Sequence, residues 1–179
     1  MGFPVPERIA LDRMVLRRAL VSDATALFEA YARDPEATRY LAIRTVTAVE
    51  HTQEFLVRCQ RDWDSGHTFV FAMTLPDDNR AFGAIDMRIE EFQASFGYAL
   101  ARSHWGRGYA STALAALVEL ALAQPGIWRA WAFCDAGNAA SARVMEKAGM
   151  RFEGRLRRWH VAPNLSAEPR DCLAYAKVK

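Results

Sequence analysis

Apolar positions in the first third of the chain predict one strand followed by two helices. The run at 14–19 is short and branched, as in a strand, whereas apolar residues after Ser22 recur every three or four positions, as on one face of a helix. The second helix is expected to begin at a capping box formed by Thr47 and Glu50 and to end near Gly66. A helical pair should therefore follow the first strand.

The middle of the chain changes to strand-like spacing. Aromatic and branched residues form runs at 68–75, 81–89 and 95–100, separated by short polar breaks, of which PDDN at 76–79 is typical of a turn. These runs predict three consecutive antiparallel strands. The third is followed by SHWGRGYAS (103–111) and then by a long apolar helical pattern.

Strands and helices alternate in the rest of the chain. A strand is expected at 128–133, then a helix that begins with Asn138 and ends at Gly149, and then two closing strands. This order predicts an α/β fold with a mixed, mostly antiparallel central sheet and helices on both faces. The segment from 95 to 133 should cross over to a parallel neighbouring strand.

Length and charge restrict the classes of function. No repeat or linker divides the chain, so we expect a single domain spanning 1–179. The 23 basic and 21 acidic residues leave a net charge of +2, which argues against nucleic acid as the main partner. The longest apolar run, 113–123, is too short to span a bilayer, and prolines and charges interrupt the N-terminal residues where a secretion signal would lie. We therefore expect a cytoplasmic protein without membrane contact.

Three tryptophans follow apolar stripes and are expected in the core: Trp63, Trp128 and Trp131.

The three cysteines, Cys59, Cys134 and Cys172, are far apart in the sequence. No histidine or second cysteine stands at metal-ligand spacing from any of them. The sequence therefore predicts neither a metal site nor a disulfide framework, and free thiols suit a reducing compartment.

Two glycines before the long helix raise the question of what approaches the backbone there. Gly106 and Gly108 flank Arg107, and a helix N-terminus offers unpaired N–H groups and the positive end of the helix dipole. Without side chains at the glycines a diphosphate can reach these groups, and the Arg107 guanidinium can meet its oxygens. A plain tight turn is the alternative. The dinucleotide fingerprint GxGxxG fails because Ser111 replaces its third glycine, and the nucleotide P-loop motif is absent too.

Two motifs resemble the GNAT-type N-acetyltransferases. WGRGYAS (105–111) resembles the acetyl-CoA loop of that family, with Trp105 where the family often has Gln or Arg. NAASARVMEKAGMRFEGRLR (138–157) and RDCLAYAKV (170–178) are similar to segments of the branch that acetylates ribosomal-protein N-termini. The resemblance spans essentially the whole chain. It implies the GNAT fold, acetyl-CoA as co-substrate without a metal, and transfer of an acetyl group to a primary amine.

The resemblance also assigns the contacts to the coenzyme. The diphosphate would meet the loop backbone, and the pantetheine arm would pair along the end of the strand at 95–100 as an extra strand does. Asn138 would add a contact, although an asparagine is equally expected there as a helix cap. The positions implied for acetyl-CoA are Tyr98, Leu100, Gly106, Arg107, Gly108, Tyr109, Ala110, Ser111 and Asn138.

Direct transfer from a thioester to an amine needs a neutral amine, a stabilised oxyanion and, preferably, protonation of the leaving thiolate. Many GNAT enzymes protonate the thiolate with a tyrosine seven residues after the asparagine, but Met145 occupies that position. The ribosomal-protein branch uses a serine three residues after the asparagine, and Ser141 matches it. A structural role for Ser141 in the first helical turn is the alternative.

Two residues compete for the role of general base. The resembling branch has a glutamate at the end of the strand that follows its Glu-Gly pair, and alignment through Glu153 and Gly154 places His160 there. Histidine can accept a proton near neutral pH, although a packed or surface histidine is the alternative. Asp86, on a strand beside the expected cleft, is the second candidate, and a solvated strand carboxylate is its alternative.

The sequence leaves the acceptor open. A protein N-terminus and a small amine both suit, because acceptor specificity lies in loops, and the family shapes its acceptor pocket around Tyr40 and Ile43. A non-catalytic acyl-CoA-binding sensor is the alternative to an enzyme. An exposed edge strand near the C-terminus would allow a homodimer, and the arginines at 151–158 are expected to form a solvated face on it.

Overall fold

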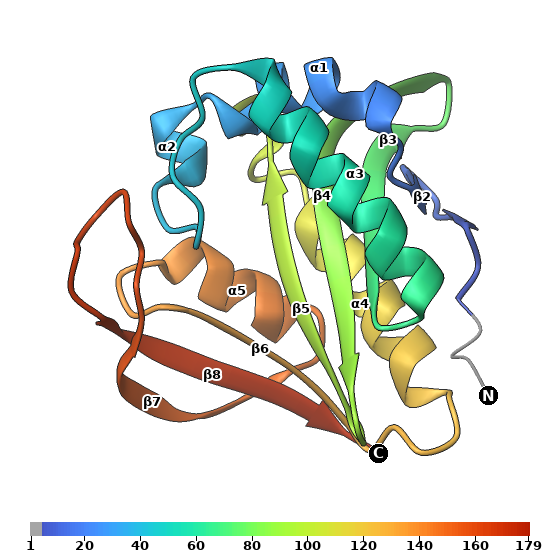
Figure 1. Cartoon of the computed structure of the whole chain (residues 1–179). Coiled ribbons are helices and arrows are strands. Elements are labelled where there is room, and N and C mark those ends of the chain that lie inside the picture. Colours follow the sequence, from blue (N-terminus) through green and yellow to red (C-terminus); the bar gives the residue numbers. More distant parts are fainter. Residues whose placement is uncertain (1–4) are drawn as a thin grey trace.

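The computed structural model describes residues 5–179; residues 1–4 lie outside the described part. Its centre is an eight-stranded sheet in the order β1-β2-β3-β4-β5-β6-β8-β7 (Figure 1). Neighbouring strands are antiparallel except β5 and β6, which are parallel. The strands are β1 (Arg8–Ala10), β2 (Val15–Arg18), β3 (Thr68–Leu75), β4 (Asp78–Glu90), β5 (Gln93–Leu100), β6 (Arg129–Asp135), β7 (Arg151–His160) and β8 (Arg170–Val178).

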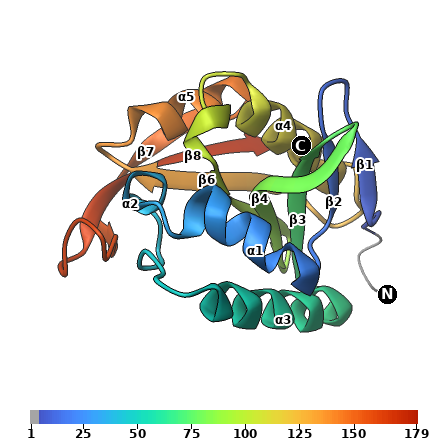
Figure 2. The same ribbon diagram turned by 90° about the horizontal axis from the view of Figure 1, so that it is seen from above.

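Helices cover the sheet unequally. Figure 2 shows α4 and α5 on one face, and α1 and α3 on the other, where α3 does not extend over β6, β8 and β7. The mixed, mostly antiparallel sheet with helices on both faces is therefore confirmed. None of the described helices is long and apolar enough to cross a membrane. The helices are η1 (Val21–Asp23), α1 (Ala24–Leu27), η2 (Phe28–Ala32), α2 (Pro35–Thr38), α3 (Val49–Ser65), η3 (Arg102–His104), α4 (Tyr109–Leu122) and α5 (Ala139–Lys147).

Three details differ from the sequence predictions. Helix α3 begins after Ala48 without a side-chain cap, so the predicted capping box is wrong: Glu50 is the second helical residue, one position too early to close the box. The end of this helix at Gly66, with φ of 79°, is confirmed. Strand β1 was missed, because a strand of three residues carries no periodic pattern. Trp128 is 60% exposed rather than buried, because it precedes β6 at the rim of the sheet, and Trp131 is only half-buried, because it lines a surface cavity.

The feature that positions the site is the divergence of β5 from β6. The two strands pair only from Gln93–Arg129 to Ser95–Trp131 and then separate, as Figure 1 shows. Beyond Ser95 the edge of β5 that faces β6 has no strand partner among the described residues. We call the opening between the two diverging strands the wedge. It separates the sheet into a β1–β5 part and a β6–β8–β7 part.

Candidate active site

The glycine loop follows β5 directly and is open. Gly106 and Gly108 have φ of +72° and +85°, a left-handed conformation that glycine adopts without strain. A Cβ atom at Gly106 would meet nothing within 4 Å. Across the described chain, no backbone N–H group from Gly106 to Ser111 donates a hydrogen bond to the protein. The loop therefore fits a diphosphate, which these donors would bind.

The loop is held in place from its flanks. Arg13 lies over the buried ring of Tyr109, 5.3 Å from its centroid, and its Nη1 donates to the Arg107 carbonyl at 3.3 Å. The Ser111 hydroxyl donates back to the Gly108 carbonyl at 2.9 Å. The exposed Arg107 side chain makes no described ion pair, so its charge is available to an anion. These contacts fix the backbone without occupying its N–H groups.

Leu100 differs from the other implied coenzyme contacts. The Trp105 indole Nε1 donates to the Leu100 carbonyl at 2.9 Å, so the last acceptor of β5 is already bonded. The sequence marks Trp105 only as a departure from the family loop, and nothing local predicts this bond. The remaining free edge of β5 runs from Phe96 to Ala99.

A pair of hydroxyl groups lies at the wedge. The Tyr98 hydroxyl is 2.7 Å from Ser141 Oγ and donates to the Ser141 carbonyl at 3.2 Å. Burial raises the pKa of Tyr98 far above its ordinary value. Asn138 caps α5 as predicted, with its Oδ1 accepting from the Ser141 N–H at 3.1 Å. The structure thus brings together three residues predicted separately, and the side-chain contact of Tyr98 was missed because Tyr98 was named only for its place on the strand.

Cys134 lies close to the same helix start but is poorly suited to nucleophilic catalysis. Its Sγ is 3.7 Å from the Asn138 carbonyl. Burial raises the pKa of Cys134 to about 11, so the thiolate is scarce at neutral pH. Direct transfer without a cysteine intermediate agrees with this environment.

Asp86 lies on the face of the sheet that is opposite to α4 and α5. Ala84, two residues earlier on β4, belongs to the cluster under α1 and α3, and residues two apart on a strand share a face, so Asp86 is on that side. Its partner on β5 is Gly97, where a Cβ atom would come within 2.9 Å of Asp86 Oδ2. Arg88 Nη2 lies 2.7 Å from Asp86 Oδ1. Burial nevertheless raises the pKa of Asp86 to about 6, a value suited to a base near neutral pH.

His160, the other candidate base, ends β7. Its ring packs edge-on against Phe133 with centroids 5.2 Å apart. Ala132 and Cys134 on β6 are buried in the core under α4 and α5, so Phe133 and His160 lie on the face away from α5. The structure therefore places Ser141 on one face and both candidate bases on the other, with the wedge between them.

The loops expected to shape the acceptor pocket are fastened together. Asn164 Nδ2 donates to the carbonyls of Thr38 at 2.8 Å and Ile43 at 2.9 Å, and its Oδ1 accepts from the Thr45 N–H at 3.1 Å. The Tyr40 hydroxyl donates to the Gly137 carbonyl at 3.2 Å. The segment before α3 is thus tied both to the β7–β8 loop and to the loop before α5. Asn164 was missed because nothing local in the sequence marks it.

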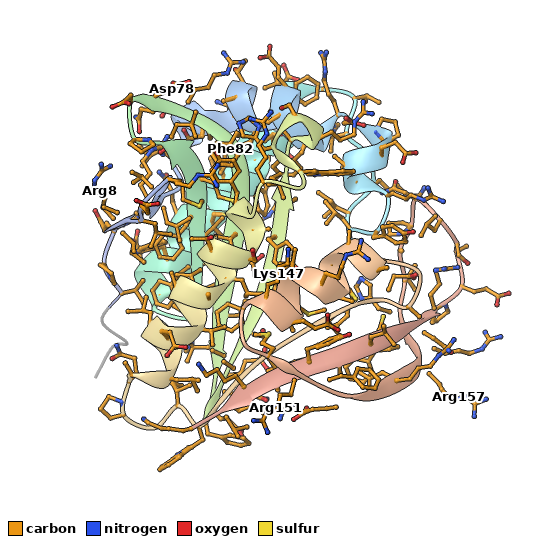
Figure 3. The ribbon with its side chains drawn as sticks, turned by 180° about the vertical axis from the view of Figure 1, so that it is seen from behind. Arg8, Asp78, Phe82, Lys147, Arg151 and Arg157 are labelled. Carbon is orange, nitrogen blue, oxygen red and sulfur yellow. The ribbon has the colours of Figure 1, made fainter. Side chains whose placement is uncertain are left out.

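One further expectation concerns β7. Asp171 of the neighbouring strand β8 accepts from Arg155 Nε of β7 with its Oδ2 at 2.9 Å. Arg151 and Arg157 extend outward from β7 (Figure 3), which confirms a solvated arginine face on this edge strand. Homodimer formation stays a prediction.

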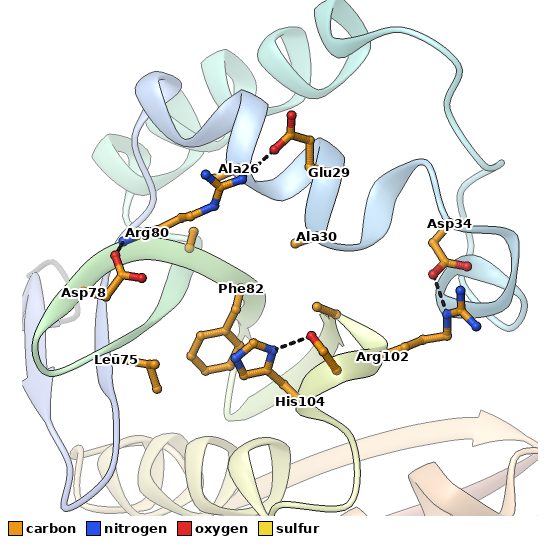
Figure 4. Close-up of a pocket in the computed structure, with 13 residues that line it drawn as sticks. Ala26, Glu29, Ala30, Asp34, Leu75, Asp78, Arg80, Phe82, Arg102 and His104 are labelled. Carbon is orange, nitrogen blue, oxygen red and sulfur yellow. Dashed lines mark hydrogen bonds and ion pairs between the residues drawn. The ribbon is translucent and has the colours of Figure 1, made fainter.

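The larger of two described cavities, about 400 Å³, lies between α1, the β3–β4 turn and η3 (Figure 4). The His104 ring stacks on Phe82 with centroids 4.2 Å apart. Two ion pairs lie among the residues that line the cavity: Arg80 with Glu29, and Arg102 with Asp34. None of the predicted site residues lines it. The wedge, where open donors and proton-carrying groups meet, is therefore the candidate active site.

Comparison with known proteins identifies the family. The model of the acetyltransferase (GNAT) domain matches residues 13–151. The chain belongs to the GNAT acetyltransferase family. This GNAT protein is accordingly an acyltransferase enzyme. YoaA of Bacillus subtilis (strain 168), named an uncharacterized N-acetyltransferase, is 26% identical to it over 180 residues. The match covers 99% of this chain and 98% of YoaA.

Solved structures share the GNAT fold over nearly their whole length. The microcin C7 self-immunity acetyltransferase MccE, in complex with acetyl-CoA and AMP, aligns with a TM-score of 0.86 at 19% identity over 98% of both chains. RimL, the ribosomal L7/L12 alpha-N-protein acetyltransferase, in complex with coenzyme A, aligns with a TM-score of 0.82 at 23% identity over 99% of this chain and 98% of its own. At these identities they establish a common fold. In residues 5–179 no cluster of three or more histidine, cysteine or acidic side chains is arranged to hold a metal ion.

Proposed function

We propose that the protein transfers the acetyl group of acetyl-CoA directly to a primary amine. The observation that carries the proposal is the row of unpaired N–H groups at 106–111, which joins the wedge and its Tyr98–Ser141 hydroxyl pair. Two phosphate groups would satisfy those donors, and MccE and RimL, which share the fold, are in complex with acetyl-CoA and coenzyme A, respectively.

The coenzyme contacts follow from the same geometry. The backbone of the loop and the Arg107 side chain bind the diphosphate. The free edge of β5 between Phe96 and Ala99 offers backbone groups to the pantetheine arm, as an added strand would use them. The Leu100 carbonyl already accepts from Trp105, so the pantetheine arm would have to use its second lone pair.

The hydroxyl pair serves the leaving sulfur. Ser141 donates a hydrogen bond to the developing thiolate, and the Tyr98 proton turns from the Ser141 carbonyl to Ser141 Oγ across their 2.7 Å contact. A serine hydroxyl alone is a weak acid, so the second donor stabilises the charge that Ser141 takes on. Asn138 fixes Ser141 by capping the helix from which it projects.

Removal of either hydroxyl tests this assignment. Ser141→Ala is expected to lower kcat about 100-fold and Tyr98→Phe about tenfold, because the second donor acts only through the first. The double variant should be no slower than Ser141→Ala. Steady-state kinetics measure kcat, and calorimetry confirms that coenzyme affinity is kept. Tyr175→Phe, which removes a hydroxyl bonded to Glu146 at 3.2 Å, is the control. Fully additive losses would contradict a shared role.

Asp86 is the better-supported base and His160 the alternative. Gly97 has no side chain, so the Asp86 carboxylate can lie directly against β5 at the position next to Tyr98, from where it would reach the amine directly or through one water. His160 lies on the same face, packed against Phe133. The raised pKa of Asp86 favours it, because a carboxylate that titrates near pH 6 is a stronger base than an ordinary one.

The acceptor loops provide a separate test. Asn164→Ala is expected to raise KM for the acceptor about tenfold with little change in coenzyme affinity, because the segment around Tyr40 and Ile43 loses its fastening. Asn79→Ala, which removes an asparagine bonded to Arg17 at the start of β4, is the control. An unchanged acceptor KM in a folded Asn164→Ala protein would rule out this role.

Thiol release from acetyl-CoA with a panel of amines tests the proposed function as a whole. The panel contains peptides with free N-termini, polyamines, amino acids and aminoglycosides. Amine-dependent release of coenzyme A is expected. Tight coenzyme binding without release in the presence of any amine would contradict it and support an acyl-CoA sensor.

A further inference from the structure

The β6–β8–β7 part of the sheet has an uncovered face with an aromatic groove. We define this groove by Trp131 of β6, Leu156 and Trp159 of β7, and Ala174 of β8, which line a cavity there together with Gln93, Arg129, Glu153, Gly154 and Arg155. Phe133 of β6 packs beside the cavity against Trp131 and Trp159. None of the described helices covers this face (Figure 1). The large side chains come from the two flanking strands, β6 and β7, and the central strand β8 contributes the small Ala174. The methyl group of Ala174 therefore forms the floor of the groove, and the larger side chains form its sides.

The walls are packed against one another and form a real cavity. Trp131 and Phe133 are stacked with centroids 6.0 Å apart, and Phe133 meets Trp159 edge-on at 6.4 Å. The cavity that Trp131 and Trp159 help to line has a volume of about 290 Å³. Trp159 remains 52% exposed. Apolar side chains held open to solvent in this way are typical of binding surfaces.

The charged groups at the rim are already neutralised. Arg129 is ion-paired with Glu153, and Arg155 is paired with Asp171 at 2.9 Å. The groove therefore offers rings and methyl groups rather than a free charge. Its chemistry suits an apolar or aromatic side chain better than a charged small molecule.

The groove is continuous with the acceptor side of the wedge. Phe133, which packs against Trp131 and Trp159 beside the cavity, also contacts His160 with ring centroids 5.2 Å apart, and both lie on the face away from Ser141. From Phe133 the groove follows β6 to Arg129, four residues away and roughly 13 Å at the usual strand rise. An extended peptide segment of about four residues has this length, whereas a small amine would leave most of the groove empty.

We propose that the aromatic groove binds the residues that follow the reactive amine of a polypeptide acceptor, and that it selects an aromatic or large apolar side chain within the first few positions. This inference rests on the proposed acetyl transfer and names the substrate class for it. The amine enters the wedge past His160, and the following side chains lie between Trp131 and Trp159.

Two matched peptides and three tryptophan variants test the groove. One six-residue peptide has a free N-terminus and phenylalanine at its third and fourth positions, and the other has glycine there. Trp131→Ala and Trp159→Ala are expected to raise KM for the phenylalanine peptide about tenfold, with kcat and the glycine-peptide KM within twofold. Trp128→Ala is the control, because Trp128 is 60% exposed but does not line the cavity. Circular dichroism and coenzyme affinity confirm that each variant is folded.

A binding measurement separates this inference from the proposed function. The phenylalanine peptide with an acetylated N-terminus cannot react, yet it should bind the wild-type protein about tenfold more tightly than either groove variant in calorimetry. Such binding without turnover of any peptide would support the groove and contradict acetyl transfer. Equal KM changes for both peptides, or turnover unaffected by either variant, would overturn the groove alone. Loss of a dimer in sedimentation, with peptide binding unchanged, would overturn it in favour of a second copy of the chain.

Discussion

Gly108→Val is expected to weaken acetyl-CoA binding by at least about 100-fold while the protein remains folded. Gly108 precedes the first residue of α4, and its N–H group and the next ones are unpaired within the described residues. A branched side chain there would hold the phosphates away from these donors. Loss of two charge-assisted hydrogen bonds, each contributing about 1.5–3 kcal/mol, suffices for a change of this size.

The control for Gly108→Val is Gly126→Val. Gly126 also has a left-handed φ, +84° against +85° at Gly108, and a Cβ atom there meets nothing within 4 Å. Both variants therefore carry a similar backbone strain of about 1–2 kcal/mol, but only one alters the loop. Calorimetric titration with acetyl-CoA and thermal unfolding measure the two effects. Equal coenzyme affinity in the two variants would argue against the phosphate cradle.

Asp86→Asn is expected to lower kcat between about 100-fold and 1,000-fold at pH 7.5 by removing the general base. Burial raises the pKa of Asp86 to about 6, and the carboxylate must be ionised to accept a proton. In the wild-type enzyme kcat/KM should therefore fall about tenfold per pH unit below pH 6. In Asp86→Asn this acidic limb should disappear. The pH–rate profile of both proteins measures it.

His160→Ala distinguishes the two candidate bases in the same experiment. If Asp86 is the base, His160→Ala keeps the acidic limb, whereas Asp86→Asn loses it; the opposite result assigns the role to His160.

The pH dependence of folding stability gives a separate check of the raised pKa of Asp86. Because the folded-state pKa of Asp86 is raised above 3.8, its contribution to stability is present at low pH and lost as the pH rises through about 6. Asp86→Asn should remove that loss in chemical unfolding, whichever residue is the base.

The fold could be predicted from the sequence because its signals are local. Apolar spacing located α4, the C-terminal end of α3 at Gly66 and the antiparallel run from β3 to β5. It failed where tertiary contacts decide the outcome. Strand β1 exists because it pairs with β2, and Trp128 is exposed because the chain reaches the sheet rim there. The single-domain and cytoplasmic assignments stay predictions.

The site residues, too, could be predicted only where their signal in the sequence is local. Gly106, Gly108 and Asn138 were found because glycine before a helix and asparagine at its start are local signals. The Tyr98–Ser141 contact joins residues 43 positions apart, and Asn164 reaches Thr38 over 126 positions. Spacing within one sequence cannot show contacts of this range. The coenzyme and catalytic roles of all these residues remain proposals.

The short parallel ladder between β5 and β6 has a mechanical consequence. Three residue pairs join the β1–β5 part of the sheet to the β6–β8–β7 part at one end of the wedge, and at the other end the Tyr98 hydroxyl bonds to α5. A molecule bound along the free edge of β5 would contact both parts and transmit force between them. A change in the width of the wedge, rather than movement of a separate lid, is then the motion that this architecture makes easiest.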